Sequence, residues 1–264
     1  MLLFFDIDGT LFSNRTHTIP DSAIRAISQA RKNGHLAFIN TGRTKAGMQK
    51  ILWDLPFDGY LLGCGSRIIY HGDTLLASSF PMETGRKIIS LMDDFGIDAF
   101  LEGSEDDYVK REPYHLPIMN KVTRGFMKMG LCLSAFIEDG NFLYDKFVVM
   151  SDDEEKAAGF FKSVEPWVDV IDRGLNTGIN AYECVQKGYS KASAMRFISG
   201  HLGIPLSESL AFGDSSNDLT MLCAAGSGVA MGEHSPVIES CCSFITETVE
   251  NDGIAAALEH FGLI

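Results

Sequence analysis

Short apolar runs alternate with longer amphipathic stretches over the first third of the chain. Leu2–Phe5 and Leu36–Ile39 have the length and composition of buried strands. Between them, residues 20–32 carry apolar side chains at helical spacing, and Asn33-Gly34 is typical of a helix end. A third strand is expected at residues 60–62. Strands that alternate with helices favour a parallel sheet.

The same pattern predicts two further features before residue 82. Residues 45–52 suit a helix, and residues 67–70 with 74–78 suit a hairpin around His71-Gly72-Asp73. From residue 83 to about 183 the pattern of expected elements changes: a helix, short strands and acidic turns replace the regular alternation. The alternation then resumes, with helices expected at 190–201, 217–224, 235–240 and 252–259 and strands at 210–212, 228–230 and 243–245.

This organisation predicts an α/β fold in which both ends of the chain build one domain. We expect a doubly wound, mainly parallel, Rossmann-like core from residues 1–82 and 184–264. Residues 83–183 are expected to form an inserted α+β domain.

Composition narrows the classes of function. The 264 residues carry a net charge of −13, which disfavours binding to nucleic acid or to an anionic membrane. An anionic substrate would have to be met by local cations, because the overall field repels it. No apolar run approaches a membrane span, and the first run is too short for a signal peptide, so a cytoplasmic protein is expected.

The cysteines and histidines suggest no metal site. None of the six cysteines is spaced as CxxC, which favours free, mostly buried thiols in a reducing compartment. The seven histidines show no ligand-like pairing, so zinc is not expected.

Two carboxylates two residues apart, Asp6 and Asp8, follow the first strand, and Gly9 comes next. Open α/β sheets bind their ligands outside the carboxyl ends of the strands. One such acid can attack a phosphorus atom while the other moves the proton of the leaving group. The alternative is an acidic surface turn, which is disfavoured because three further polar clusters follow, each expected beside its own strand.

Four motifs in order carry a resemblance that covers nearly the whole chain. They are Asp6-Ile7-Asp8-Gly9-Thr10, Asn40-Thr41-Gly42-Arg43, Lys191 and Gly213-Asp214-Ser215-Ser216-Asn217-Asp218. Together they resemble the haloacid dehalogenase-like superfamily, in its Cof-type sugar-phosphatase branch with a type IIB cap. The resemblance implies that the inserted domain is a cap that selects the substrate.

The resemblance also implies roles for individual residues. Asp6 would be the nucleophile that forms an aspartyl-phosphate, and Asp8 the general acid and then the general base. Mg²⁺ would be held by Asp6, Asp8 (through its backbone carbonyl) and Asp214, with Asp218 as an auxiliary or indirect ligand. The implied phosphate-binding residues are Ile7, Thr41, Gly42, Lys191 and Asn217, whereas Lys187 would be a surface residue.

The resulting prediction is a Mg²⁺-dependent phosphatase acting on a small phosphorylated metabolite, most simply a sugar phosphate. A phosphomutase of the same fold and a non-catalytic phosphometabolite-binding protein remain alternatives. Cys64-Gly65-Ser66 and Gly232-Glu233-His234 stand where many relatives have Asn-Gly-Ala and Gly-Asn-Ala, which leaves substrate preference open. The sequence also leaves open the oligomeric state, the role of Arg43 and whether the cap opens and closes.

Overall fold

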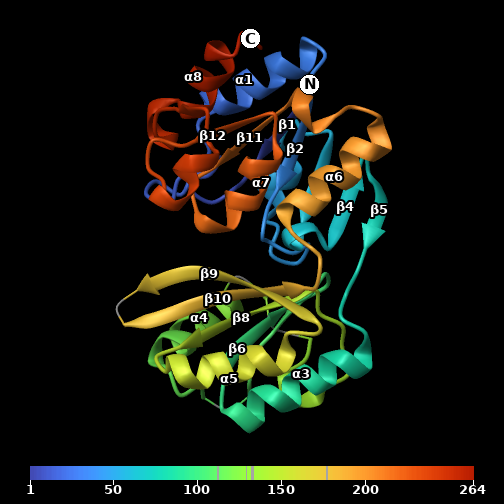
Figure 1. Cartoon of the computed structure of the whole chain (residues 1–264), viewed down its shortest axis with the longest axis vertical. Helices are drawn as coiled ribbons and strands as arrows, with labels where there is room; N and C mark the ends of the chain where they lie inside the picture. The colour runs from blue at the N-terminus through green and yellow to red at the C-terminus, as the bar shows by residue number, and fades with distance from the viewer. Residues whose placement is uncertain (112, 129, 132–133, 177) are drawn as a thin grey trace. The chain divides into compact units, whose positions relative to one another are not determined.

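Both ends of the chain build one unit of the structure, and the middle builds another (Figure 1). The computed structural model describes residues 1–111, 113–128, 130–131, 134–176 and 178–264. The first unit, the core, consists of Met1–Gly42, Lys50–Ala77 and Ser190–Ile264. The second unit, the cap, consists of Arg43–Gln49 and Ser78–Tyr189.

An eight-stranded sheet in the order β13-β12-β11-β1-β2-β3-β4-β5 forms the centre of the core. Pairing is parallel from β13 to β3, and β4 and β5 add an antiparallel hairpin at one edge. The strands are β1 (Leu2–Phe5), β2 (Leu36–Asn40), β3 (Gly59–Leu62), β4 (Arg67–Tyr70), β5 (Asp73–Ala77), β11 (Ser209–Gly213), β12 (Ser227–Ala230) and β13 (Phe244–Ile245).

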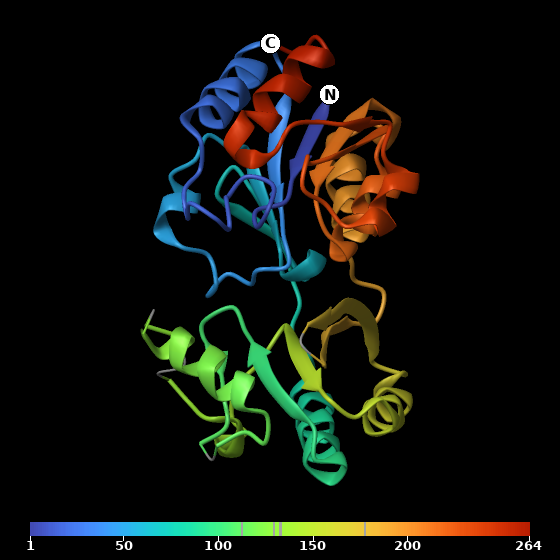
Figure 2. The same cartoon turned by 90° about the vertical axis from the view of Figure 1, so that its left-hand side faces the viewer.

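Helices cover both faces of this sheet (Figure 2). On one side lie α1 and α8, and on the other lie α6 and α7. The four residues of β1 are wholly buried, as expected for an apolar strand in a sheet covered on both faces. The predicted α/β class with a mainly parallel sheet is therefore confirmed. The core helices are α1 (Asp21–Lys32), α2 (Lys50–Trp53), α6 (Lys191–Leu202), α7 (Leu219–Ala224) and α8 (Gly253–His260).

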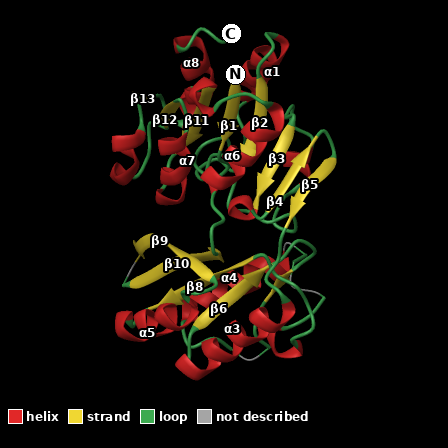
Figure 3. Ribbon diagram, turned by 45° about the vertical axis from the view of Figure 1, so that its right-hand side comes forward, coloured by secondary structure: helices red, strands yellow, loops and turns green. Residues whose placement is uncertain are grey.

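The cap is built on a five-stranded antiparallel sheet in the order β7-β6-β8-β10-β9 (Figure 3). Side chains of one sheet face, such as Leu101 and Phe147, pack with α3 and α5. Alternate residues, such as Phe100 and Val148, pack with Met119 of α4 on the opposite face. The cap elements are α3 (Met82–Phe95), β6 (Asp98–Glu102), β7 (Asp107–Tyr108), α4 (Pro117–Lys128), β8 (Lys146–Ser151), α5 (Glu154–Val164), β9 (Val168–Asn176) and β10 (Ile179–Gln186).

Some predicted elements differ from the structure. The helix expected at residues 45–52 is wrong for most of its length, because only Lys50–Trp53 is helical. Gly47 lies inside the predicted span, and glycine costs about 1 kcal/mol in a helix interior. The helix expected at residues 235–240 is a 3₁₀ helix, Pro236–Cys241, and the one expected at 217–224 begins with a 3₁₀ turn, Ser216–Asp218.

The expectation that all cysteines are free is also wrong. Cys223 of α7 and Cys241 form a disulfide, with their Cα atoms 4.7 Å apart. Packing of α7 against the 3₁₀ helix Pro236–Cys241 brings them together across 18 residues, which no local spacing indicates. Among the described residues Cys64, Cys184 and Cys242 are free, and Cys132 lies outside the described part of the chain. No helix among the described residues has the length and apolarity to cross a membrane.

Candidate active site

Two neighbouring strands of the core sheet, β1 and β11, end at carboxylates. Asp6 follows β1, and its backbone N–H donates to the carbonyl of Phe212 in β11 at 3.1 Å. Asp214 follows β11 in the same way. Because parallel strands end at the same sheet edge, the two acids meet, and Asp218 joins them from the next turn. Oxygen atoms of these three carboxylates all lie within 4.8 Å of one another.

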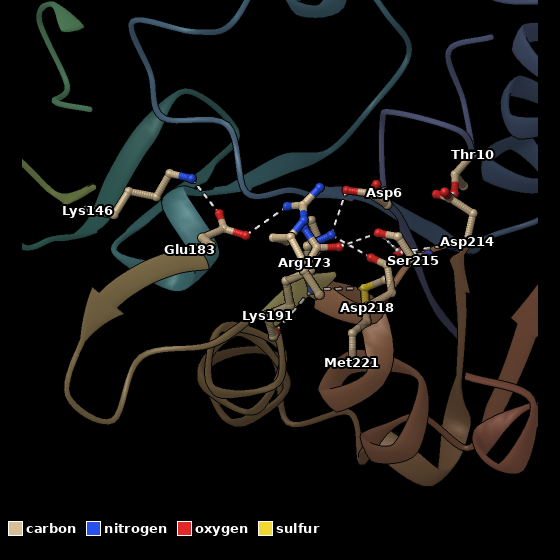
Figure 4. A network of polar contacts seen from close by, with 12 residues as sticks. Asp6, Thr10, Lys146, Arg173, Glu183, Lys191, Asp214, Ser215, Asp218 and Met221 are labelled. Carbon is tan, nitrogen blue, oxygen red and sulfur yellow. Dashed lines mark hydrogen bonds and ion pairs between the residues drawn. The ribbon is translucent and has the colours of Figure 1, made fainter. Parts of the chain in front are cut away.

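Lys191 supplies a buried cation to this group of acids (Figure 4). Its Nζ atom lies 2.7 Å from Oδ1 of Asp6 and 2.5 Å from Oδ1 of Asp218, and its side chain has no exposed surface. Lys191 is the first residue of α6, where Ser190 caps the helix by accepting from the N–H of Ser193. A lysine is unfavourable at a helix N-terminus. The two carboxylates compensate for that position.

Asp218 holds the other members of the site in place. Its Oδ2 atom accepts hydrogen bonds from the backbone N–H groups of Asp214 and Ser215, both at 3.0 Å. Since Oδ1 faces Lys191, both oxygens of Asp218 are engaged. Gly213 allows this close packing, because a Cβ atom there would lie 2.6 Å from Cβ of Asp218. Asp218 therefore orients the Asp214 loop and Lys191.

The turn after Asp6 packs closely against the side chain of Asp214, at Gly9 and at Thr10. Gly9 has φ of +81°, and a Cβ atom on it would lie 2.4 Å from Oδ2 of Asp214. Thr10, one residue on, donates from Oγ1 to Oδ1 of Asp214 at 3.1 Å. Glycine is required here both by the backbone conformation and by the approach of the carboxylate.

The protein groups leave the site short of positive charge. Burial raises the pKa of Asp6 to about 7, against the attraction of Lys191. Burial, together with the charges of Asp6 and Asp218, raises the pKa of Asp214 to about 8. Burial alone would lower the pKa of Lys191, but the Asp218 and Asp6 carboxylates outweigh it and hold that pKa well above its usual value. A divalent cation would relieve this deficit, and clustered carboxylate oxygens are the donors that Mg²⁺ prefers.

The remaining predicted site residues lie in the core close to these elements in sequence. Thr41 follows β2, is almost wholly buried, and its carbonyl accepts from the N–H of Cys64 at 3.0 Å. Oδ1 of Asn217 accepts from the hydroxyl of Ser215 at 2.8 Å. Asp8 is partly exposed and is not a member of the three-carboxylate cluster. The proposed phosphate contacts of Ile7, Thr41, Gly42 and Asn217 and the proton transfer by Asp8 stay predictions.

Two residues that sequence reasoning assigned no role contribute to the site. Thr10 binds Asp214, as described above. The Nδ2 atom of Asn40 donates to the backbone carbonyl of Lys191 at 3.1 Å and so ties β2 to the start of α6. Thr10 belongs to the motif that begins at Asp6, and Asn40 begins the motif that contains Thr41. Their positions in these motifs could have indicated a role in the site. The partner of Thr10 is 204 residues away in the sequence and that of Asn40 is 151 residues away, so no local pattern predicts these contacts.

The Cys64–Ser66 segment packs against the start of α6. A Cβ atom on Gly65, whose φ is +96°, would lie 2.5 Å from the carbonyl oxygen of Ser190. Cys64 is buried in a left-handed conformation, with φ of 53°. This segment therefore supports the helix end that presents Lys191.

A cavity of about 330 Å³ lies beside the acids. Glu233, which departs from the usual motif, forms an ion pair with Arg15 at 2.5 Å on its wall. Both side chains are mostly exposed, so the pair contributes little to stability. The lining residues are Gly9, Asn14, Arg15, Asp214, Glu233, Thr248, Val249 and Glu250.

Comparison with known proteins identifies the family. The sequence model of haloacid dehalogenase-like hydrolases matches residues 3–258, nearly the whole chain. The chain belongs to the haloacid dehalogenase-like hydrolase family. The resemblance drawn from the four motifs is thereby confirmed.

Several relatives of this family are similar to the chain over its full length. The 5-amino-6-(5-phospho-D-ribitylamino)uracil phosphatase YcsE of Bacillus subtilis is 28% identical, covering 99% of this chain and 96% of its own. The pyridoxal phosphate phosphatase YbhA of Escherichia coli is 25% identical, covering 96% of both chains. The solved structure of the subclass IIB sugar phosphatase BT4131 is 28% identical, with a TM-score of 0.84 over 100% of this chain and 99% of its own. These similarities support a phosphoric monoester hydrolase of the haloacid dehalogenase-like family.

Proposed function

We propose that the protein is a Mg²⁺-dependent cytoplasmic phosphatase that hydrolyses small phosphomonoesters, sugar phosphates among them, through an aspartyl-phosphate on Asp6. The observation that carries this proposal is the position of Lys191. Its ammonium lies against Asp6, whose carboxylate also groups with Asp214 and Asp218. A nucleophilic carboxylate that must approach a phosphate dianion needs nearby cations; Lys191 supplies one, and the three carboxylates could hold a divalent metal ion as the other.

The first half-reaction uses Asp6 and Asp8. A carboxylate oxygen of Asp6 attacks phosphorus while the bond from phosphorus to the ester oxygen breaks. Asp8, protonated at this stage, gives its proton to the leaving alkoxide. Lys191 stabilises the negative charge on the transferring phosphoryl group and keeps Asp6 oriented.

The second half-reaction reverses the role of Asp8. Its carboxylate takes a proton from water, the water oxygen attacks phosphorus, and the bond to Asp6 breaks to release inorganic phosphate. A Mg²⁺ ion bound by Asp6, Asp214 and the backbone of Asp8 would reduce the repulsion between carboxylate and phosphate. Asp218 would position Asp214 and Lys191, because both of its oxygens already accept from protein groups.

The substrate class is proposed from the relatives and from the cap. YcsE is named for a phosphorylated ribitylaminouracil, and BT4131 is described as a sugar phosphatase. Both names refer to a polyhydroxyl compound, a ribityl group in one and a sugar in the other. The core motifs can recognise only the phosphoryl group, so we assign the choice among substrates to the inserted segment, residues 83–183, which makes up most of the cap.

Phosphate release from a panel of phosphomonoesters tests this function. With Mg²⁺ we expect hydrolysis of p-nitrophenyl phosphate and of several sugar phosphates, and no hydrolysis after exhaustive chelation. A single-turnover reaction with excess acceptor sugar separates a phosphatase, which releases inorganic phosphate, from a phosphomutase, which makes a new sugar phosphate. Inactivity on all phosphomonoesters with Mg²⁺, Mn²⁺ or Co²⁺ present would contradict the proposal.

A further inference from the structure

The disulfide of the core joins two elements that also meet at the candidate metal site. It links Cys223, in the last turn of α7, to Cys241, the last residue of the 3₁₀ helix Pro236–Cys241. The residue before each of these elements contacts Asp214. The disulfide therefore ties together the far ends of two elements whose near ends hold a carboxylate residue of the site.

Backbone hydrogen bonds hold Asp214 from both of these near ends. Its N–H donates to Oδ2 of Asp218, the residue before α7, at 3.0 Å. Its carbonyl accepts from the N–H of Ser235, the residue before the 3₁₀ helix, at 2.7 Å. A movement of one element relative to the other would therefore shift the backbone of Asp214.

The 3₁₀ helix is anchored to the core sheet at its disulfide end. A Cβ atom on Gly228 of β12 would lie 2.3 Å from the carbonyl oxygen of Cys241. The carbonyl of Gly228 also accepts from the N–H of Ser243 at 2.8 Å. Through Cys241 the disulfide thus fixes the end of α7 to the sheet. When the bond is open, that end is held by noncovalent packing, such as that of Leu222 and Ile238 in one apolar cluster.

The disulfide lies where a small reagent can reach it. Cys223 is exposed and Cys241 is half-buried. Exchange requires that a thiolate reach one of the two sulfur atoms, so exposure makes the bond open to reduction. In a reducing compartment such a bond is typical of a redox-sensing site rather than of a permanent crosslink.

The neighbouring thiol of Cys242 does not compete for this bond. Its Sγ atom donates to the carbonyl of Ile238 at 3.3 Å. Burial, together with the charges of Asp218 and Glu239, raises the pKa of the Cys242 thiol to about 11. Because the thiolate is the attacking species, a thiol that stays protonated at neutral pH does not exchange with the disulfide. The reductant must therefore come from outside the protein.

We propose that Cys223 and Cys241 form a site of reversible oxidation whose state sets the Mg²⁺ affinity of the core. The inference rests on the proposed function, because it concerns the regulation of the same site. The oxidised protein holds Asp214 in place for the cation. The reduced protein binds Mg²⁺ more weakly and so hydrolyses phosphomonoesters more slowly when Mg²⁺ is limiting.

A peroxide forms the bond and a dithiol opens it. The two thiols and one hydrogen peroxide give the disulfide and two water molecules, through a sulfenic acid on one cysteine that the other thiol attacks. In the reverse direction a thiolate of the dithiol attacks Sγ of Cys223, the bond between the two sulfur atoms breaks, and Cys241 leaves as a thiolate that takes up a proton. The second thiol of the reagent then releases Cys223 as a thiol and closes the reagent's own disulfide.

Isothermal titration calorimetry with Mg²⁺ alone tests the inference without any substrate. The wild type is titrated after one equivalent of hydrogen peroxide and again after dithiothreitol, and peptide mass spectrometry verifies which cysteines are bonded. Cys223→Ser removes the bond at an exposed position, where the fold is expected to tolerate the change. Cys242→Ser is the matched control, because it removes the adjacent thiol and leaves the bond intact. Circular dichroism verifies that each protein is folded.

Reduction is expected to raise the Kd of the wild type for Mg²⁺ by about fivefold or more, the lower end of the coupling between linked sites. Cys242→Ser should show the wild-type Kd in both redox states. Cys223→Ser should show the Kd of the reduced wild type, with or without dithiothreitol. Since linkage is reciprocal, saturating Mg²⁺ should favour the disulfide by the same factor when the wild type is equilibrated in oxidised and reduced dithiothreitol.

Failure of the inference and failure of the proposed function give different results. A Kd for Mg²⁺ that stays within twofold when the bond is shown to open would overturn the inference and leave the proposed function standing. So would a wild type in which peroxide does not join Cys223 to Cys241. Absence of phosphatase activity in both redox states would overturn the proposed function, and the change in Mg²⁺ affinity would still decide whether the disulfide controls the metal site.

Discussion

The ammonium of Lys191 lies 2.7 Å from Oδ1 of Asp6, although the two residues are 185 positions apart in the chain. The contact joins the end of the first strand to the start of a helix that follows the whole cap insertion. Asp218 holds the same ammonium from the other side. The site is therefore assembled from both halves of the core.

Replacing Lys191 by methionine is expected to impair both catalysis and folding. The change leaves the buried carboxylates of Asp6 and Asp218 without their cation, which typically costs about 3 to 5 kcal/mol in the free energy of unfolding. Loss of charge stabilisation at the phosphoryl group should lower kcat/KM for p-nitrophenyl phosphate by about 100-fold or more. Urea unfolding and steady-state kinetics measure the two effects, with Lys187→Met as the control. A folded Lys191→Met enzyme with wild-type kcat/KM would refute the role given to Lys191.

Gly9 and Gly34 provide a matched pair of glycines. Both have positive φ, but a Cβ atom on Gly9 would strike Asp214, whereas one on Gly34 would have nothing within 4 Å. Alanine at either position should cost about 1 to 3 kcal/mol through backbone strain. Only Gly9→Ala should also displace Asp214 and so weaken Mg²⁺ binding, by about tenfold or more.

The rise in melting temperature on adding Mg²⁺ measures this difference without any substrate, because a ligand of the native state raises its stability. The wild type and Gly34→Ala should show the same rise, and Gly9→Ala a smaller one. Equal rises in melting temperature in all three proteins would contradict the claim that a Cβ atom at residue 9 displaces Asp214 and weakens Mg²⁺ binding.

Asp107 is expected to make stability depend on pH. Burial, with the charges of Glu102 and Asp106 opposed by Lys146, raises the pKa of Asp107 from 3.8 to about 8 in the folded protein. The folded state then holds a proton that the unfolded state has released, so stability falls as pH rises from about 4 to about 8. The asparagine variant lacks this proton.

Urea unfolding at pH 5 and pH 8 tests the assignment to Asp107. Between these values the wild type should lose at least about 1 kcal/mol more than Asp107→Asn, the equivalent of one pKa unit. Asp94→Asn, at an exposed position of the cap, should behave like the wild type. The same slope in all three proteins would show that Asp107 titrates normally.

Asp8 is expected to matter most for poor leaving groups. Asp8→Asn cannot donate a proton, so phosphoryl transfer from an alkyl phosphate should slow by about 10² to 10⁴. The loss should be smaller for p-nitrophenyl phosphate, because p-nitrophenolate leaves without a proton. Rapid-quench measurement of the first step with both substrates decides the point, and equal losses would argue against a general acid.

Much of the core followed from the sequence because its signals are local. The apolar run Leu2–Phe5 and the acids behind it predicted where a strand ends and where a polar site begins. The motif favours Lys191 over Lys187, and the structure brings Lys191 to Asp6 and pairs Lys187 with Asp169. The chemical roles in the site remain predictions.

The features that the sequence did not predict depend on contacts between distant segments. Glu102, Lys146 and Glu183 meet only through the register of three antiparallel strands, and no spacing in the sequence reports that register. The bond between Cys223 and Cys241 depends in the same way on how two short helices pack. Only Lys50–Trp53 of the helix expected at residues 45–52 forms, and Gly47 disfavours a helix in the rest of that span.

Trapping of a phosphorylated enzyme tests the central claim most directly. Wild-type protein mixed with ³²P-labelled phosphomonoester and Mg²⁺, then quenched in acid within milliseconds, should carry label that hydroxylamine removes, as an acyl phosphate requires. Peptide mapping should place the label at Asp6, and Asp6→Asn should acquire none while remaining folded. Turnover by Asp6→Asn at a rate near that of the wild type, or label on a residue other than Asp6, would contradict the account.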